Sequence, residues 1–105
     1  MRDQREPWFR ALAESLGERR CWRYEHTEDD ESRGTWWFEA VLDERGEWWC
    51  VRMVARAFGL ESAYDWEHME DEHGFLPDQP IDPEEPGLQP VPAAAFESTW
   101  RRVRP

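Results

Sequence analysis

The sequence contains no lysine and no asparagine, and all thirteen of its basic residues are arginine. It has no stretch approaching the ~20 consecutive apolar residues that a membrane-spanning helix requires. The chain begins with MRDQREPWFR, which lacks the apolar run of a secretory signal peptide. We therefore expect a cytoplasmic protein that does not bind a membrane.

Cysteine is scarce: the chain has only Cys21 and Cys50, and they do not form a Cys-x-x-Cys pair. In a reducing cytosol, isolated cysteines commonly behave as small apolar residues. We therefore expect both thiols to be buried and unpaired. A disulfide or a redox pair is the alternative interpretation.

A chain of 105 residues has the usual size of one domain, so residues 1–105 are expected to fold as a single unit. Such a chain buries roughly two-thirds of the surface that its unfolded form exposes. Eight tryptophans, five phenylalanines and two tyrosines are available for this core. Because tryptophan is also enriched at interface hot spots, some of these rings are candidate binding anchors.

Basic residues are absent between Arg56 and Arg101. This gap holds eleven carboxylates, equal in number to the net charge of −11, because the thirteen acids outside it balance the thirteen arginines. The eleven are Glu61, Asp65, Glu67, Glu70, Asp71, Glu72, Asp78, Asp82, Glu84, Glu85 and Glu97. A second acidic cluster consists of Glu28, Asp29, Asp30 and Glu31.

Two interpretations fit this charge distribution. An acidic surface keeps a protein soluble, which is the usual role of such residues. A field of one sign also speeds encounter with a partner of opposite charge by ~10–10³-fold. Nucleic acid is disfavoured as a direct ligand because its phosphates would be repelled. A basic protein is the partner that the charge favours.

Apolar periodicity predicts one helix near each end of the sequence. The first is predicted at residues 7–16, where one apolar stripe is followed by a glycine: Phe9, Leu12, Leu16 and Gly17. The second is predicted at residues 92–103, with the stripe Phe96, Trp100 and Val103.

An antiparallel sheet is predicted over residues 21–66. Alternation of polar and apolar residues indicates a strand at 21–26, and aromatic and β-branched residues indicate strands at 35–42 and 47–57. Asp43 and Gly46 occupy the first and fourth positions of a type I turn, which predicts a hairpin between the last two. Strict alternation in 47–57 would place Cys50 and Arg52 on one face. Residues 60–66 fit either a strand or a short helix, and we favour a strand joined to the previous one by a turn at Phe58-Gly59.

Residues 67–91 are charged and contain several prolines, which predicts an acidic proline-rich loop. A loop of this length is usually functional or mobile. The predicted fold class is therefore α+β: a three- to four-stranded antiparallel meander packed against an N-terminal and a C-terminal helix.

No motif in the sequence predicts catalysis. His26, His68 and His73 do not have the spacing of a metal-binding motif, and His68 and His73 are too far apart for one helical face. The serines are not set in a recognisable nucleophile motif, and no glycine-rich phosphate loop is present. We expect no enzymatic activity, no cofactor and no bound metal. The alternative is a small metal-assisted hydrolase in which the three histidines meet.

Residues 64–72 interleave carboxylates with large apolar side chains. This composition offers rigid anchors surrounded by acceptors for arginine. The predicted partner-binding residues are Asp65, Trp66, Glu67, Glu70, Asp71 and Glu72, with Glu28, Asp29, Asp30 and Glu31 as a second contact. The alternative is that Tyr64 and Trp66 pack in the core while the acids face water.

From Cys21 onward the chain resembles small, uncharacterised acidic bacterial α+β domains of the kind found as immunity proteins beside polymorphic toxins. The similarity lies in the pattern Trp-x-Tyr-x-His at 22–26, the aromatic hairpin at 36–57 and residues 90–100, which end in Phe-Glu-x-x-Trp. The resemblance implies an immunity or antitoxin protein that neutralises a cognate, basic toxin by covering its active site. A non-catalytic acidic interaction module or a mimic of duplex DNA is the alternative.

Overall fold

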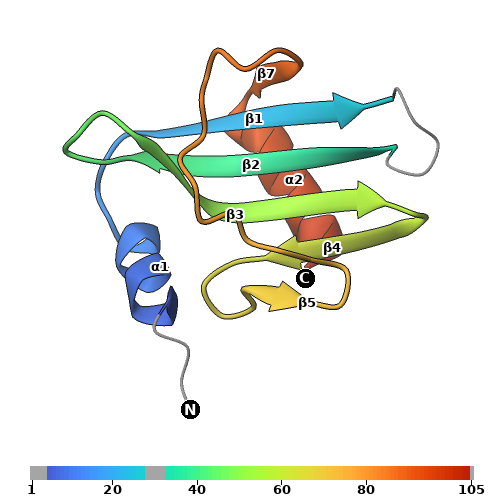
Figure 1. Ribbon diagram of the computed structural model, residues 1–105, viewed down its shortest axis with the longest axis horizontal. Helices are drawn as coiled ribbons and strands as arrows, with labels where there is room; N and C mark the ends of the chain where they lie inside the picture. Colours follow the sequence, from blue (N-terminus) through green and yellow to red (C-terminus); the bar gives the residue numbers. More distant parts are fainter. Residues whose placement is uncertain (1–4, 28–32, 105) are drawn as a thin grey trace.

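The computed structural model describes residues 5–27 and 33–104 (Figure 1). None of these residues forms a helix with the length and apolar character needed to cross a bilayer. In chain order the elements are α1 (Arg5–Ala13), β1 (Arg19–His26), β2 (Gly34–Leu42), β3 (Trp48–Ala57), β4 (Leu60–Tyr64), β5 (Glu70–Asp71), β6 (Gly74–Phe75), β7 (Leu88–Val91) and α2 (Ala93–Val103).

The described strands form one five-stranded antiparallel sheet, in the order β4-β3-β2-β1-β7, and a separate hairpin of β5 and β6. The predicted α+β class is confirmed, but the sheet is larger than the predicted three to four strands. The hairpin turn at Asp43 is also confirmed, because its carboxylate accepts the N–H groups of Arg45 and Glu47 at 2.8 and 2.9 Å.

The fifth strand lies within the segment that was predicted to be a loop. β7 pairs with β1 over four residues, from Cys21 opposite Val91 to Tyr24 opposite Leu88. It contains Pro90, which lacks an N–H group, and it lies at an edge of the sheet, where a missing donor is tolerated. The prediction of a loop throughout residues 67–91 is therefore wrong at β5, β6 and β7.

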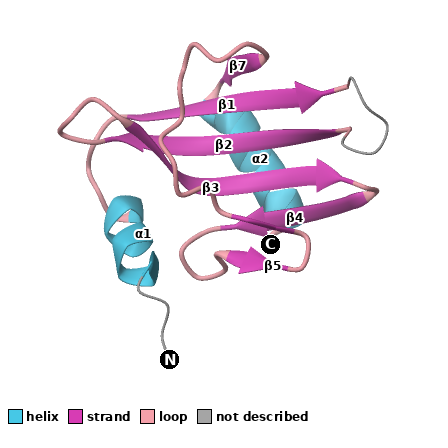
Figure 2. Ribbon diagram, in the orientation of Figure 1, coloured by secondary structure: helices cyan, strands magenta, loops and turns pink. Residues whose placement is uncertain are grey.

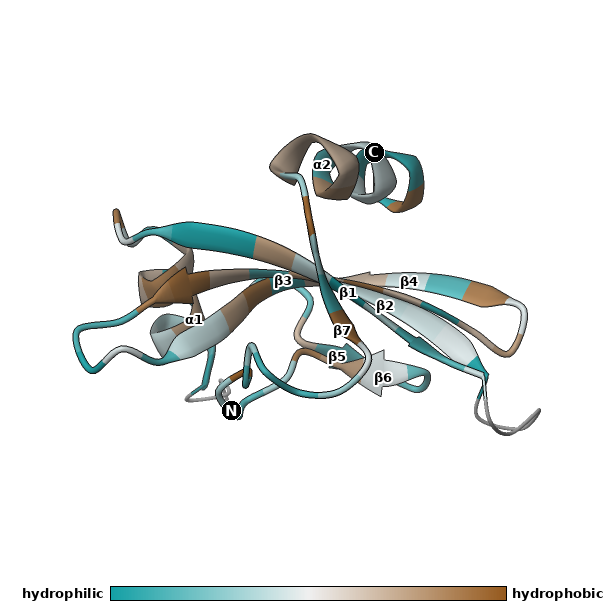
Figure 3. Cartoon of the chain, turned by 90° about the horizontal axis from the view of Figure 1, so that it is seen from above, coloured by the Kyte–Doolittle hydropathy of each residue, from teal (hydrophilic) through white to brown (hydrophobic). Residues whose placement is uncertain are grey.

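The sheet separates two unlike layers. Figure 3 shows α2 on one side and the β5–β6 hairpin, with the chain that leads to β7, on the other. Residues 76–87, which we call the crossing loop, run from β6 across this second face to the opposite edge of the sheet (Figure 2). α1 lies at one end of the sheet and contacts β3.

A β-bulge in β3 changes which side chains face each layer. Glu39 pairs with Arg52 whereas Ala40 pairs with Cys50, so one residue of β3 is extra. Side chains alternate between faces only while pairing is regular. The bulge places Cys50 on the face of Met53, with which it packs, and not on that of Arg52. The strict alternation predicted for this strand is therefore wrong.

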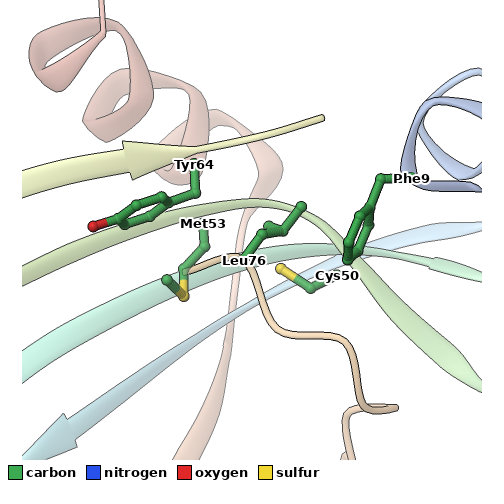
Figure 4. Packing of buried hydrophobic residues seen from close by; sticks show 5 residues of the cluster. All are labelled: Phe9, Cys50, Met53, Tyr64 and Leu76. Carbon is green, nitrogen blue, oxygen red and sulfur yellow. The ribbon is translucent and has the colours of Figure 1, made fainter. Parts of the chain in front are cut away.

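The main core lies between the sheet and the elements on the crossing-loop side. Phe9, Cys50, Met53, Tyr64 and Leu76 converge there, and each is at most 5% exposed (Figure 4). Burying one such apolar side chain contributes about 1.5–3 kcal/mol. Because Phe9 belongs to α1 and Leu76 to the crossing loop, the cluster fixes both segments to the sheet.

The N-terminal helix is shorter than predicted at its C-terminal end. α1 ends at Ala13, and Leu16, which was predicted to lie in its apolar stripe, is fully exposed. The guanidinium of Arg19 donates hydrogen bonds to the carbonyl oxygens of Ala13 and Ser15, at 2.5 and 3.2 Å. Carbonyl groups at a helix end lack helical partners, and a side-chain donor satisfies them and stabilises the early end.

α2 lies where it was predicted, with Pro92 as its N-cap, and it contacts the sheet through a partly buried charged cluster. The guanidinium of Arg52 lies 5.0 Å from the ring centroids of both Phe96 and Trp100. It donates to Glu39 at 2.8 and 2.9 Å and also to Glu97 of α2. Burial acts to lower the pKa of Arg52, but these hydrogen bonds raise it above the usual value. Arg52 therefore stays charged and joins β3 to α2.

Both cysteines are buried free thiols, as predicted. Burial is the main cause that raises the pKa of Cys21 to about 11, and burial also raises the pKa of Cys50. Since the thiolate is the reactive form, both side chains stay protonated and act as packing residues near neutral pH.

Replacing Phe96 with alanine should destabilise the protein by about 3–5 kcal/mol, because the change empties a fully buried site beneath α2. Leu16→Ala is the matched control: it removes an apolar side chain that is fully exposed, so stability should change by no more than about 0.5 kcal/mol. Urea unfolding followed by tryptophan fluorescence measures both. Equal losses would contradict the packing of α2.

Candidate functional site

The acidic cluster Glu28, Asp29, Asp30 and Glu31 lies outside the described residues. The strands on either side of it are placed: His26 ends β1 opposite Gly34, which begins β2. Gly34 in turn lies opposite Ala57, so this end of the sheet also carries the turn between β3 and β4.

Two of the predicted arginine acceptors already bind arginines of this chain. Asp65 accepts a hydrogen bond from Arg104 at 3.0 Å, and Glu70 accepts one from Arg5 at 2.8 Å. Asp65 also accepts two backbone N–H groups of the turn that follows it, at 2.9 and 3.1 Å. These two carboxylates therefore hold the ends of the chain against β4 and the β5–β6 hairpin.

Asp71 is the centre of a hydrogen-bond cluster. It accepts the hydroxyl of Tyr64 at 2.8 Å and the N–H groups of His73 and Gly74 at 2.8 and 3.2 Å. Its second oxygen lies 3.0 Å from Nε2 of His68, whose ring stacks on Tyr64. Burial acts to raise the pKa of Asp71, but these hydrogen bonds lower it to about 2. The cluster fixes the β5–β6 hairpin to the buried Tyr64.

The remaining predicted contacts differ in exposure. Trp66 is partly buried, packs against the core and lies beneath the guanidinium of Arg10, 5.0 Å from its ring centroid. Glu67 is exposed, and the side chain of Glu72 is 84% exposed, with Nε2 of His73 at 3.4 Å. Trp66 thus helps to hold α1, whereas Glu67 and Glu72 face solvent.

The crossing loop carries further exposed carboxylates: Asp78, Asp82, Glu84 and Glu85. In the described part of the chain, no arginine lies within ion-pair distance of these four. The loop is held on the sheet by buried Leu76 and by Ile81, whose N–H donates to the carbonyl of Trp48 at 2.8 Å. Its carboxylates are therefore presented from a fixed backbone.

Charge pairing differs between the two faces of the molecule. On the α2 side, Glu61 accepts a hydrogen bond from Arg102 at 2.6 Å, and Glu97 accepts one from Arg52. These arginines hold the pKa values of both carboxyls below the usual range. The crossing-loop side carries Glu72 and the four carboxylates of the loop. Among the described residues, Glu72 and the four carboxylates of the crossing loop thus form a group without arginine partners on the face opposite α2. Other carboxylates without an arginine partner lie in the β2–β3 turn, at Asp43, Glu44 and Glu47, and after β4, at Glu67.

A groove of about 550 Å³ opens on this same face, between the sheet and the β5–β6 hairpin. Ala55 of β3, which lines the groove, lies between Trp36 of β2 and Ser62 of β4, and its small side chain leaves space beside the larger Trp36. The lining is mainly aromatic and apolar, and includes Tyr24, Trp36, Phe38, Met53, Phe58 and Phe75.

Phe58 stands at the end of this groove in a conformation that is unusual for phenylalanine. The two-residue turn between β3 and β4 has φ values of +56° at Phe58 and +74° at Gly59. A left-handed conformation costs a residue with a side chain roughly 1–2 kcal/mol. The side chain of Phe58 is 74% exposed, so contacts within the chain offset little of this cost. Strain of this kind concentrates at functional sites.

The sequence predictions missed the groove, although one signal was available. A turn at Phe58-Gly59 was predicted, and two-residue hairpin turns favour asparagine, aspartate or glycine at both central positions. A phenylalanine at the first of them breaks that preference and could have drawn attention to Phe58.

The histidines do not share one pocket. His26 and His73 line the groove, whereas His68 contacts Asp71. Within residues 5–27 and 33–104, no three or more His, Cys, Asp or Glu side chains are arranged to hold a metal ion. The main features of the groove are therefore its aromatic lining and the acidic residues near it.

Comparison with protein-family models, with curated proteins and with solved structures found no match for this chain.

Removing the hydroxyl of Tyr64 should raise the pKa of Asp71. Tyr64→Phe keeps the ring but removes one donor, so this pKa should move from about 2 toward the ordinary value of about 3.9. Because the folded-state pKa is depressed, Asp71 stabilises the fold above its unfolded pKa, and this contribution is lost as the pH falls toward 2. Carboxyl NMR titration measures the shift; Tyr24→Phe, which leaves the Tyr64–Asp71 bond intact, should not change it.

Replacing Phe58 with glycine should stabilise the fold by about 1 kcal/mol, since glycine adopts a positive φ without the steric cost. Phe75→Ala removes a second exposed ring from a strand, where no such strain exists, and should bring no gain. Urea unfolding of the two variants tests the assignment. A loss of stability in Phe58→Gly would show that the ring stabilises the isolated protein.

Proposed function

We propose that this protein is a non-catalytic binding protein that holds a basic protein partner on the face that carries the crossing loop. The observation that supports the proposal most is the combination on one face of carboxylates without arginine partners and exposed aromatic rings. Apolar anchors surrounded by polar groups are the usual composition of an interface hot spot. The negative field would attract the partner and orient it.

The specific form of the proposal is an immunity or antitoxin protein that neutralises a toxin by covering its active site. The resemblance of residues 22–100 to small acidic bacterial domains favours this role. A toxin that acts on nucleic acid needs a cationic groove to hold phosphates, and such a groove complements the acidic face. Binding there would block the substrate sterically, so no reaction by this chain is required.

A non-catalytic acidic module that mimics duplex DNA is the alternative. Mimicry requires carboxylates at regular, phosphate-like spacing along one face. Here Glu72 and Asp78 lie next to an aromatic groove of about 550 Å³, and duplex DNA has no counterpart to such a groove. The groove therefore supports a protein partner over mimicry.

The experiment is expression of the protein encoded by the neighbouring reading frame, with and without this chain. If that protein is a toxin, growth should be restored by co-expression, and the two purified proteins should form a complex. Neutralising Asp78, Asp82, Glu84 and Glu85 to the corresponding amides should slow association about tenfold at low salt, because attraction of opposite charges accelerates encounter.

The matched control neutralises four exposed carboxylates elsewhere: Glu14, Glu18, Glu25 and Glu44. This variant loses the same net charge but keeps the acidic face, so it should slow association much less. Equal effects would mean that only total charge matters, and unchanged association in both variants would remove the crossing loop from the interface.

A further inference from the structure

We propose that the aromatic groove is an anchor site that receives one apolar side chain, aromatic or long aliphatic, from a protein segment flanked by arginine or lysine. The inference rests on the proposed function and deepens it. In it the groove makes the specific contact with the partner, and the carboxylates supply the long-range electrostatic attraction. The occupant is a segment of the basic partner, and not a second copy of this chain.

The shape of the groove supports an apolar anchor. Its volume of about 550 Å³ falls within the ~300–1,000 Å³ of pockets that hold ligands. Trp36 and Phe38 line it from the sheet, and Phe75 lines it from the β5–β6 hairpin. Both walls are rigid, because the sheet is continuous there and the hairpin is fixed to the buried Tyr64 through Asp71. A preformed apolar site loses little conformational entropy on binding.

Phe58 supplies a second, independent observation. Its backbone is held at a φ of +56° and its ring is 74% exposed at the groove, so contacts within the chain offset little of the cost of this conformation. Burial of this ring against a partner would offset it. Phe75 is 57% exposed at the same groove, so two phenylalanines present apolar surface that the isolated protein leaves open.

The charges around the groove indicate which residues should flank the anchor residue in the partner segment. Among the residues that the structure describes, no arginine lines the groove, and its titratable lining residues are His26 and His73. Glu72 shares with Phe58 an adjoining hollow of about 220 Å³, and exposed Asp78 directly follows Pro77, which lines the groove. The site is therefore apolar at its centre and acidic at its border, which matches an apolar residue between basic ones.

The same charges argue against the other macromolecular occupants. A second copy would bring another net charge of −11 to the groove, and like charges repel. Nucleic acid would bring phosphates to the same carboxylates.

The test uses the full chain and three peptides of the pattern Arg-Arg-X-Arg-Arg, in which X is tryptophan, leucine or alanine. The tryptophan and leucine peptides should bind at least about tenfold more tightly than the alanine peptide in calorimetric titrations. Truncating an anchor residue at an interface lowers the affinity by at least about this factor. NMR signals of Trp36 and Phe75 should shift with tryptophan as X.

Phe58→Gly and Phe75→Ala should each reduce the preference for tryptophan over alanine, whereas Leu16→Ala, which truncates an exposed apolar residue outside the groove, should preserve it.

The outcomes separate this inference from the proposed function. Equal, salt-dependent binding of all three peptides would overturn the anchor site but leave an acidic face that attracts cations. If none of the peptides bound at low salt, both the anchor site and the proposed function would be overturned. Binding of free indole in the groove as tightly as the tryptophan peptide would make the groove a small-molecule site, and dimerisation abolished by Phe58→Gly would make it a contact between copies; either result overturns the proposal.

Discussion

The attachment of the crossing loop to the sheet is the constraint on which the acidic face depends. Leu76 is buried in the main core, and the N–H of Ile81 bonds to the carbonyl of Trp48. These contacts hold a proline-containing acidic segment across the sheet, although its carboxylates repel one another. The energy comes from apolar burial and backbone pairing, while the carboxylates point to solvent. Hydrophobic contacts and one backbone hydrogen bond thus determine where the four carboxylates of the crossing loop lie.

The two faces of the sheet use charge in opposite ways. Beneath α2, Arg52 is enclosed by Phe96 and Trp100 and bonded to Glu39 and Glu97, so positive and negative groups neutralise one another inside the fold. On the other face, carboxylates remain without arginine partners, and one of them, Glu72, lines a hollow beside the aromatic groove. The first arrangement joins layers of one chain. The second leaves both attraction and apolar surface available to another molecule.

Local patterns in the sequence predicted the elements that depend on local interactions. The range of α2 follows from its apolar stripe, and the β2–β3 turn follows from Asp43, whose side chain bonds to nearby N–H groups. The failures depend on distant residues. β7 forms because its backbone completes the edge of β1, and the early end of α1 depends on Arg19 of β1. The bulge in β3 shifts the alternation because pairing with β2 determines it.

The sequence by itself determined the amount of negative charge, its concentration in the second half of the chain and the supply of aromatic rings. Only the tertiary structure decided which carboxylates stay available. Asp65 and Glu70 lie in a stretch without basic residues, yet they pair with Arg104 and Arg5 from the two ends of the chain. Ion pairs act over a few ångströms of space, and a groove forms where side chains of different strands fail to fill the surface. Both depend on which residues the fold brings together.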